Sequence, residues 1–404
     1  MQASGLVIDQ DWLKDPHAVA VTDALGRQGG IARYVGGCVR DAVLDRPVRD
    51  VDIATDQPPD RVIALLESAG LKAIPTGIDH GTVTAVSGRR PFEITTLRVD
   101  VETHGRHATV AFTDNWLEDA ERRDFTFNAL FCDPDGTVYD PVGGLEDLSA
   151  GRVRFIGDAA ARIEEDALRI LRFFRFHAWF GRGDLDQEGL AACIALKDRL
   201  DVLSVERLRA EICRLLESSS PAETALAMLE AGILAHILPE ALGQTRLERL
   251  IPLEDRYDRG EPLRRLAAMT DLSKETLSAI GERWRFSNKD KERLSAMAGA
   301  GPDPDLADLG LHVSLYREGL ETFTDKLLLA WAEDGQDCAD LLARARAWTI
   351  PKFPLMGRDA LSHGMEAGEA VGSLLAALED EWIAEDFGPD REDLLRRLEG
   401  RIAL

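Results

Sequence analysis

Residues 36–52 read GGCVRDAVLDRPVRDVD, and this stretch decides the fold of the first part of the chain. Gly36 and Gly37 follow the apolar run ARYV and precede a helical opening, a pattern that predicts a strand, a tight turn and a helix. Asp50 and Asp52 come next, in a second predicted strand. Because strand residues i and i+2 point to the same face, we expect the two carboxylates to lie side by side.

The carboxylate pair indicates a site for a divalent cation. Two like charges about 4 Å apart repel by roughly 4 kcal/mol at an effective dielectric near 20. Mg²⁺ offsets this repulsion and prefers carboxylate and phosphate oxygens. A solvated strand edge is the alternative interpretation, but the preceding turn favours the cation, because N–H groups near Gly37 and the side chain of Arg40 suit a triphosphate. Glu93, in the predicted strand FEITTL, either joins this site or is an exposed strand acid.

Composition indicates a soluble protein of several structural units. The chain has 404 residues, of which 45% are hydrophobic and 30% charged. This length is more than one hydrophobic core usually holds. No run of apolar residues is long enough to span a membrane, and the N-terminus lacks the features of a secretory signal. The five cysteines are scattered, which favours reduced thiols. We therefore expect a cytoplasmic protein without a membrane association, and no protein partner is predicted.

Net charge does not exclude a nucleic-acid partner. The formal charge is −24, but charges are screened over about 8 Å at physiological salt, so local charge governs contacts. Arginines outnumber acids between Ala150 and Arg182, whereas acids dominate from Glu321 to Leu404. A polyanion is therefore expected to meet the first of these regions more readily.

The order of sequence patterns predicts an α+β protein. Strand-like and helix-like segments alternate up to about residue 145, and helical periodicity dominates afterwards. We expect a mixed head at 1–145, followed by an all-helical neck at 146–215, body at 216–320 and tail at 321–404.

Two further motifs carry candidate nucleotide-binding residues. In ERRDFTFNAL (121–130) we expect the phenylalanines to pack in the core while one of the two arginines reaches the nucleotide. In EEDALRILRFFRF (164–176), Asp166 heads a row of arginines spaced every three residues. Asp166 can accept a hydrogen bond from the exocyclic amine of C or A, and Arg169 can donate one to the adjacent ring nitrogen. G and U present the opposite polarity and would leave both groups unpaired, at a cost of roughly 1–3 kcal/mol for each group. A solvated basic helix face is the alternative.

The ordered motifs resemble one enzyme family. YVGGCVRD, RDVDIAT, TGIDHGTVTAV, EITTLR, ERRDFTFNAL, DPVGGLEDL and EEDALRILRFFRF, which cover roughly residues 33–180, are similar to those of the class II tRNA nucleotidyltransferases. These are the CCA-adding enzymes, in the polymerase β-like superfamily with the bacterial poly(A) polymerases. The resemblance implies a polymerase β-like head followed by a helical neck, body and tRNA-binding tail.

The resemblance also implies the reaction and the roles of the site residues. The reaction is template-independent addition of CCA to tRNA 3′ ends from CTP and ATP, with pyrophosphate released. Carried over motif by motif, Asp50 and Asp52 are the catalytic carboxylates that hold Mg²⁺. The nucleotide-binding residues are Gly37, Arg40, Arg123, Asp166, Arg169, Arg172 and Arg175.

Three alternatives stay open at this point. A poly(A) polymerase shares the head chemistry, although TGIDHGTVTAV is similar to the tRNA-specific branch. An enzyme that adds only CC or only A has nearly the same motifs. A catalytically inactive RNA-binding protein is a third possibility, but it predicts a broken carboxylate pair, and Asp50 and Asp52 are both intact.

The segment RVDVETHGRHATVAF (98–112) bears on the choice between CCA and CC addition. It is polar, has no clear helical or strand period, and is expected to be a loop that gates the active site. The family resemblance implies that a loop here is needed for A addition and is shortened in CC-adding relatives. Its full length favours complete CCA addition.

Overall fold

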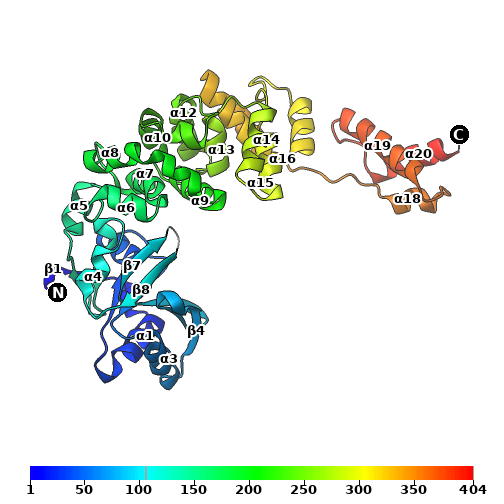
Figure 1. Ribbon diagram of the computed structural model, residues 1–404. Helices are drawn as coiled ribbons and strands as arrows, with labels where there is room; N and C mark the ends of the chain where they lie inside the picture. Colours follow the sequence, from blue (N-terminus) through cyan, green and yellow to red (C-terminus); the bar gives the residue numbers. More distant parts are fainter. Residues whose placement is uncertain (105–106, 404) are drawn as a thin grey trace. The chain divides into compact units, whose positions relative to one another are not determined.

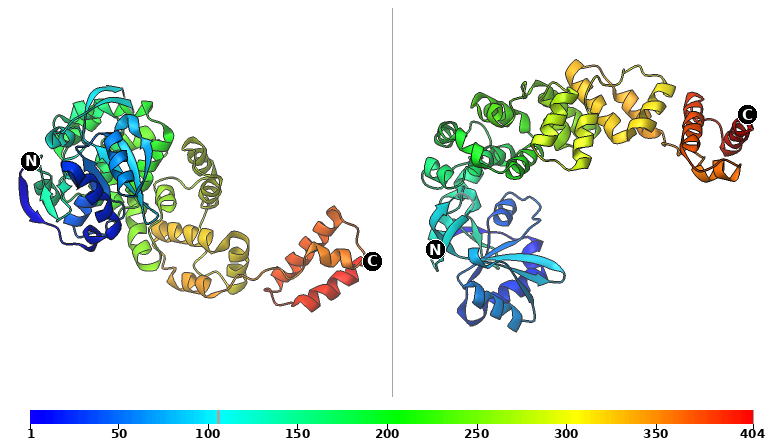
Figure 2. Two further views of the ribbon diagram at one scale, coloured as in Figure 1. Left: turned by 90° about the horizontal axis from the view of Figure 1, so that it is seen from below. Right: turned by 45° about the vertical axis from the view of Figure 1, so that its right-hand side comes forward.

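The computed structural model describes residues 1–104 and 107–403 and has the expected α+β architecture. The chain divides into two compact units, Met1–Pro239 and Glu240–Leu404. All strands lie in the first unit, and the second is built of helices (Figures 1 and 2). No described helix combines the length and the apolarity that crossing a membrane requires.

The head of the first unit is built on an eight-stranded sheet in the order β1-β10-β9-β2-β3-β6-β5-β4, with a separate hairpin β7-β8. The strands are β1 (Ala3–Val7), β2 (Ala32–Val35), β3 (Asp52–Thr55), β4 (Lys72–Gly77), β5 (Thr82–Ser87), β6 (Arg90–Thr96), β7 (Arg98–His104), β8 (His107–Phe112), β9 (Phe131–Cys132) and β10 (Thr137–Tyr139). Within the large sheet β3 and β6 run parallel and the other described pairs are antiparallel. In the sequence, α3, β4 and β5 connect these two parallel strands.

Helices interrupt and then follow the strands. Those of the first unit are α1 (Pro16–Gly26), α2 (Gly37–Val43), α3 (Pro59–Ser68), α4 (Trp116–Glu121), α5 (Gly144–Ala150), α6 (Ala159–Glu165), α7 (Leu168–Phe180), α8 (Gln187–Ala195), α9 (Val205–Leu216), α10 (Pro221–Glu230) and α11 (Ile233–Ile237). Short 3₁₀ turns are η1 (Asp11–Lys14), η2 (Arg27–Gly29), η3 (Ile78–His80), η4 (Thr126–Asn128) and η5 (Lys197–Val202).

The second unit continues with helices only. They are α12 (Thr245–Tyr257), α13 (Pro262–Ala268), α14 (Lys274–Arg283), α15 (Asn288–Ala296), α16 (Asp308–Asp334), α17 (Ala339–Ala347), α18 (Gly357–Ser362), α19 (Glu369–Ala384) and α20 (Arg391–Ile402). Within α16, Gly319 has φ 79° and ψ 160°, which breaks the helix. The expected boundary between body and tail at residues 320–321 falls one residue after this break.

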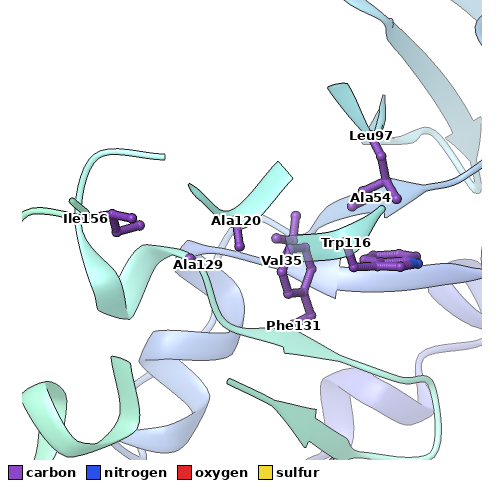
Figure 3. Packing of buried hydrophobic residues seen from close by; sticks show 8 residues of the cluster. All are labelled: Val35, Ala54, Leu97, Trp116, Ala120, Ala129, Phe131 and Ile156. Atoms are coloured by element: carbon purple, nitrogen blue, oxygen red, sulfur yellow. The ribbon is translucent and has the colours of Figure 1, made fainter. Parts of the chain in front are cut away.

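A hydrophobic cluster supports the middle strands of the large sheet (Figure 3). Val35 of β2, Ala54 of β3 and Phe131 of β9 are buried there together with Trp116 at the start of α4. The rings of Trp116 and Phe131 pack edge to face with centroids 5.2 Å apart, an arrangement that the charge distribution of aromatic rings favours. Strand β2, which leads into Gly36, and strand β3, which begins at Asp52, therefore rest on one core.

Most expected elements are confirmed, and their local causes can be seen. The segment DRVIALLESAG forms α3, whose chain reverses through Gly70 at φ 76°, a conformation that glycine adopts without steric cost. Past Tyr139, every helix or strand that the structure names is a helix. The helical pattern of residues 222–238 is split into α10 and α11, because Gly232 takes φ 71° between them.

The segment 98–112 differs from expectation. It was expected to lack strand structure, but Arg98–His104 and His107–Phe112 pair as the antiparallel hairpin β7-β8. The sequence did not indicate strands here because the hairpin lies outside the large sheet. Its residues therefore do not alternate between apolar and polar as those of a strand packed on the core do. Gly105, within this expected loop, lies outside the described residues.

Candidate active site

The turn between β2 and α2 brings the glycine pair next to two guanidinium groups. Gly36 has φ 73° and ψ −122°, which disfavours any residue with a side chain. The position of a Cβ on Gly36 would lie 3.6 Å from Nη1 of Arg123, and one on Gly37 would lie 3.7 Å from Nη2 of Arg40. The sequence prediction that Gly37, Arg40 and Arg123 come together is thus met in space.

The acidic residues gather at the start of β3. Asp52 is the first residue of that strand and pairs in register with Glu93 of the parallel strand β6. Asp50 precedes the strand, so the expectation that both aspartates lie on one strand was wrong, although Asp50 is close enough for its charge to act on Asp52. Desolvation by the surrounding head, with the charges of Glu93 and Asp50, raises the pKa of Asp52 to about 6, against the attraction of Arg123.

This arrangement fits a cation held by two carboxylates. Among the described residues no group of three or more His, Cys, Asp or Glu side chains is placed to hold a metal. The charge of Glu93 acts on Asp52. Mg²⁺ commonly uses one or two carboxylates and takes its other oxygens from water and substrate phosphates. Such an ion would neutralise the negative charge at Asp52, which the protein compensates only in part.

Arg123 lies opposite these acids on the turn after α4. Its Nε and Nη2 donate to Oδ2 of Asp119 at 3.2 and 3.0 Å. Asp119 is almost fully buried and also accepts from Arg122, and the two arginines lower the pKa of Asp119 although its burial acts in the opposite direction. Among the described residues nothing accepts from Nη1 of Arg123, the nitrogen nearest Gly36, so it remains available to a ligand.

Arg40 is held inside the site from three sides. Its Nη1 donates to Oδ1 of Asn128 at 2.9 Å, its Nε donates to Asp41 at 2.9 Å, and its guanidinium lies 4.2 Å from the ring centroid of Phe180. Asn128 in turn donates to Oδ1 of Asp124 at 3.0 Å. Burial lowers the pKa of Arg40, an effect that a bound phosphate would reverse.

Asp166 and Arg169 are close to each other, but each is already hydrogen-bonded to protein. Asp166 lies in the turn between α6 and α7, where it accepts from the backbone N–H of Leu168 at 3.1 Å and from Nη2 of Arg207 at 2.6 Å. Arg169 donates through Nη1 to Glu165 and to the carbonyl of Arg162. A carboxylate has about four acceptor positions and an arginine five N–H donors, so both side chains keep capacity for a base edge.

Arg172 and Arg175 form ion pairs inside the protein. Nε of Arg172 donates to Oδ2 of Asp124 at 2.6 Å, and Nε of Arg175 donates to Oε2 of Glu211 at 2.5 Å. Burial disfavours the charge of Arg172, but Asp124 and Glu211 outweigh it and raise the pKa of Arg172. For Arg175, burial prevails and lowers the pKa. These two arginines are placed to support the site from below rather than to present free donors.

Aromatic rings form the floor of this charged network. As expected, Phe125 and Phe127 are buried, and both pack against Phe176 of α7. The guanidinium of Arg175 lies 4.0 Å from the centroid of Phe176. Cations over aromatic faces are attracted by the ring quadrupole, so the phenylalanines fix the guanidinium planes as well as filling space.

Five partner residues were not anticipated: Asn128, Asp124, Glu165, Arg207 and Glu211. Asp124 lies 48 residues from Arg172, and Glu211 lies 36 residues from Arg175. Only folding brings such pairs together, although an acid within a helix that is otherwise apolar on that face, as at Glu211, is a signal that a buried cation is nearby.

A pocket of about 370 Å³ lies beside the turn between α6 and α7, lined by Glu165, Asp166, Arg199, Ser204 and Arg207 among others. It does not include Asp52 or the glycine turn.

Comparison with known proteins gives a consistent picture. Residues 32–154 match the model of the poly(A) polymerase head domain, and residues 184–243 match a probable RNA and SrmB binding site of polymerase A. The mitochondrial CCA tRNA nucleotidyltransferase 1 of Danio rerio is 32% identical over 389 residues, which is 91% of this chain and 86% of the relative. The CCA-adding enzyme of Geobacillus thermodenitrificans is 40% identical over 222 residues, 54% of each chain.

Solved structures agree over the full length. The Bacillus stearothermophilus CCA-adding enzyme in complex with CTP superposes with a TM-score of 0.76 at 28% identity and covers 96% of this chain and 97% of that one. The Thermotoga maritima CCA-adding enzyme complexed with tRNA shares the fold, with a TM-score of 0.63 at 18% identity over 100% of both chains.

Proposed function

The chain belongs to the CCA tRNA nucleotidyltransferases, and we propose that it builds the complete CCA end of tRNA from CTP and ATP, releases pyrophosphate, and uses the head residues described above. The observation that carries this proposal is a similarity that runs through both units of the chain, at 32% identity over 91% of its length, with the acid pair, the glycine turn and the selecting turn all present. A poly(A) polymerase is the less favoured reading, because the similarity to a CCA tRNA nucleotidyltransferase extends well beyond the head that the two kinds of enzyme share.

Asp50 and Asp52 are proposed to hold Mg²⁺. The fit rests on the register that sets Asp52 beside Glu93, with Asp50 near enough for its charge to act on Asp52. A cation would offset the burial and the repulsion that raise the pKa of Asp52. The chemistry such an ion supplies is activation of the attacking hydroxyl and neutralisation of charge on the triphosphate. The protein's own contribution is to fix Asp52 at the end of a strand beside Glu93.

The triphosphate is proposed to lie against the turn at Gly37. Arg123 supplies an unengaged Nη1 on the side of Gly36, and Arg40 supplies a guanidinium whose desolvation an anion would offset. Asp119 and Asn128 hold these two arginines in place.

The base is proposed to be selected by Asp166 and Arg169. Asp166 accepts from the exocyclic amine of C or A, and Arg169 donates to the adjacent ring nitrogen. Nη2 of Arg207 donates to Oδ2 of Asp166 at 2.6 Å and so fixes the orientation of this carboxylate. Arg172 and Arg175 are proposed to support the nucleotide site from α7, where Asp124 and Glu211 fix their guanidinium groups.

Complete CCA addition, rather than CC or A addition alone, is favoured by the hairpin 98–112. A hairpin of this length attached beside the site could reorganise a pocket that first accepts a pyrimidine and then a purine. The tail is proposed to bind tRNA. The division of the chain into head, neck, body and tail is likewise proposed.

The deciding experiment offers the protein a tRNA lacking its last three nucleotides, with CTP and ATP, and sequences the product. A terminal CCA supports the proposal. A product ending in CC, a single A on a CC-ended tRNA only, or a run of A residues would replace it with the corresponding alternative.

The cytoplasm is the proposed compartment. The five cysteines are free thiols in the described structure, which suits a reducing environment. Three animal relatives carry a mitochondrial name, so the alternative to test by fractionation is an organelle matrix.

A further inference from the structure

The segment that joins α2 to β3 makes an unexpected contact with the far end of the base-selecting helix. Residues 44–51 carry the chain from the phosphate side of the site to the acid pair. Within this segment Arg46 reaches the last turn of α7, where its Nη2 donates to the carbonyl of Trp179 at 3.0 Å. Its guanidinium also lies 4.7 Å from the centroid of Phe180.

The contact satisfies needs on both sides. The last four carbonyls of an α-helix lack helical partners, and cations near that end are favoured by the helix dipole. Arg46 supplies both a donor and a charge to Trp179 at the end of α7. Its backbone N–H donates to the carbonyl of Asp41 at 2.8 Å, so the residue is also fixed to the end of α2.

Arg46 is exposed and the contact lies at the surface, but two features set it apart from a surface ion pair. Although Asp41, Asp45 and Asp50 are near in sequence, no carboxylate among the described residues forms an ion pair with Arg46. The ring of Phe180 is shared with Arg40, whose guanidinium lies 4.2 Å from the same centroid, and Arg46 adds to the lowering of the pKa of Arg40. The two positively charged guanidinium groups therefore share the ring of Phe180 in spite of their mutual repulsion.

From this geometry we propose that Arg46 is a positioning residue for nucleotide addition. It fastens the acid-bearing segment 44–51 to α7, so that the acid pair and the base-selecting turn at the other end of α7 are held at a fixed spacing. The inference rests on the proposed roles of Asp50 and Asp166. It assigns Arg46 no contact with nucleotide, metal ion or RNA.

The test compares Arg46→Ala with Arg49→Ala. Arg49 lies in the same segment, is exposed, and forms no side-chain hydrogen bond or ion pair with any described residue. Hydrogen–deuterium exchange of the protein alone should show faster exchange in residues 44–51 and in the last turn of α7 for Arg46→Ala only. In steady-state assays with CTP, Arg46→Ala should lower kcat about tenfold, while the KM for the tRNA stays within twofold, and Arg49→Ala should match the wild type.

The outcomes are separable. Arg46→Lys, which can still donate to Trp179 but stacks less well on Phe180, should recover part of the lost rate and most of the exchange protection. Equal exchange and equal kcat for Arg46→Ala and Arg49→Ala would overturn the proposal. Faster exchange with an unchanged kcat would also overturn it, since the contact would then be structural alone. If the wild type adds no CCA, the proposed function fails, whereas the exchange comparison still decides whether the contact holds the segment.

Discussion

Individual residues of the site are held by partners that are far away in sequence. Asp52, Arg40, Arg123 and Asp166 could be predicted from local motifs, because glycines, paired acids and spaced arginines leave a signature in a short window. The partners of two of them could not, because Asn128 lies 88 residues from Arg40 and Arg207 lies 41 residues from Asp166. The partner of Arg123, Asp119, is only four residues away. The chemistry of each group is therefore legible in the sequence, but its orientation depends on the tertiary fold.

The substitution Asp52→Asn is expected to inactivate the protein and to stabilise it. Addition of C should fall by more than about a thousandfold, because a ligand to the cation is lost, while tRNA affinity stays within about threefold. Without metal, removal of one charge from the Asp52–Glu93 pair should raise the melting temperature by about two degrees. Measuring addition and thermal unfolding side by side checks both effects.

The control for that substitution is Glu67→Gln, an exposed acid on α3 with no described partner. It should leave activity and melting temperature unchanged. Chelation with EDTA should stop addition by the wild type, and Mg²⁺ should restore it. Near-normal turnover of Asp52→Asn with Mg²⁺ would show that the cation is held elsewhere.

Asp166→Ala is expected to relax base selection. Loss of the acceptor should reduce the preference for CTP over UTP roughly 5- to 100-fold, the value of one unpaired hydrogen-bonding group. Competition between the two nucleotides in a single assay measures this ratio directly. Glu164→Gln, an exposed neighbour, is the control. An unchanged ratio in Asp166→Ala would exclude this carboxylate from reading the base.

At the scale of elements, periodicity predicted most helices and strands, and the failures have specific causes. The helix expected over residues 222–238 breaks at a single glycine with positive φ. The hairpin 98–112 was not recognised because strands outside the large sheet need no apolar alternation. Patterns of burial thus predict elements that pack in the core and fail for elements that do not.

Helix α9 is expected to stabilise the site through Glu211. Glu211→Gln keeps an acceptor near Arg175 but removes the charge that compensates two partly buried guanidinium groups. We expect the free energy of unfolding to fall by about 2 kcal/mol, together with a lower affinity for CTP. Denaturation of the full chain, compared with that of Glu217→Gln at the exposed end of the same helix, measures the difference. Equal stability of the two variants would mean that Arg172 and Arg175 do not depend on this acid.

The hairpin β7-β8 gives a prediction about the order of addition. Deleting residues 103–108 should leave addition of the two C residues nearly intact and stop addition of the terminal A, because only the larger purine requires the pocket to change. Product lengths on a sequencing gel separate the two steps. A deletion variant that completes CCA at the normal rate would remove both the role of the hairpin and its support for complete CCA addition.

At the scale of the whole molecule, an acidic chain must bind an acidic RNA. Most arginines of the described tail are paired with acids, for example Arg391 with Asp359 and Arg397 with Glu385. Lys352 and Arg358 are exposed and form no ion pair within the described part of the chain. Few phosphate contacts are therefore expected, and with them a shallow dependence of affinity on salt.

Removal of the tail is expected to weaken tRNA binding while CTP binding is preserved. The cut should follow Ala347. A cut at residue 320 would remove Asp325, the buried partner of Arg264 and Arg293, and would unfold the second unit. For a chain of residues 1–347 we expect tRNA affinity to fall about tenfold, with a smaller salt slope. Loss of CTP binding to the same extent would show that the tail serves stability rather than RNA recognition.

The edge strand β1 has a consequence for how this protein is made. It pairs with β10, and the hydroxyl of Ser4 donates to the carbonyl of Val138, 134 residues later. At about 5–20 residues per second, a ribosome needs roughly 7–27 s to synthesise the intervening chain. During that interval the first strand leaves the ribosome without its partner, while β2, β3 and the crossover to β6 can already assemble. The strand that is synthesised first is thus among the last to be paired. A chaperone that recognises unpaired strands would have the most time to bind at the N-terminus.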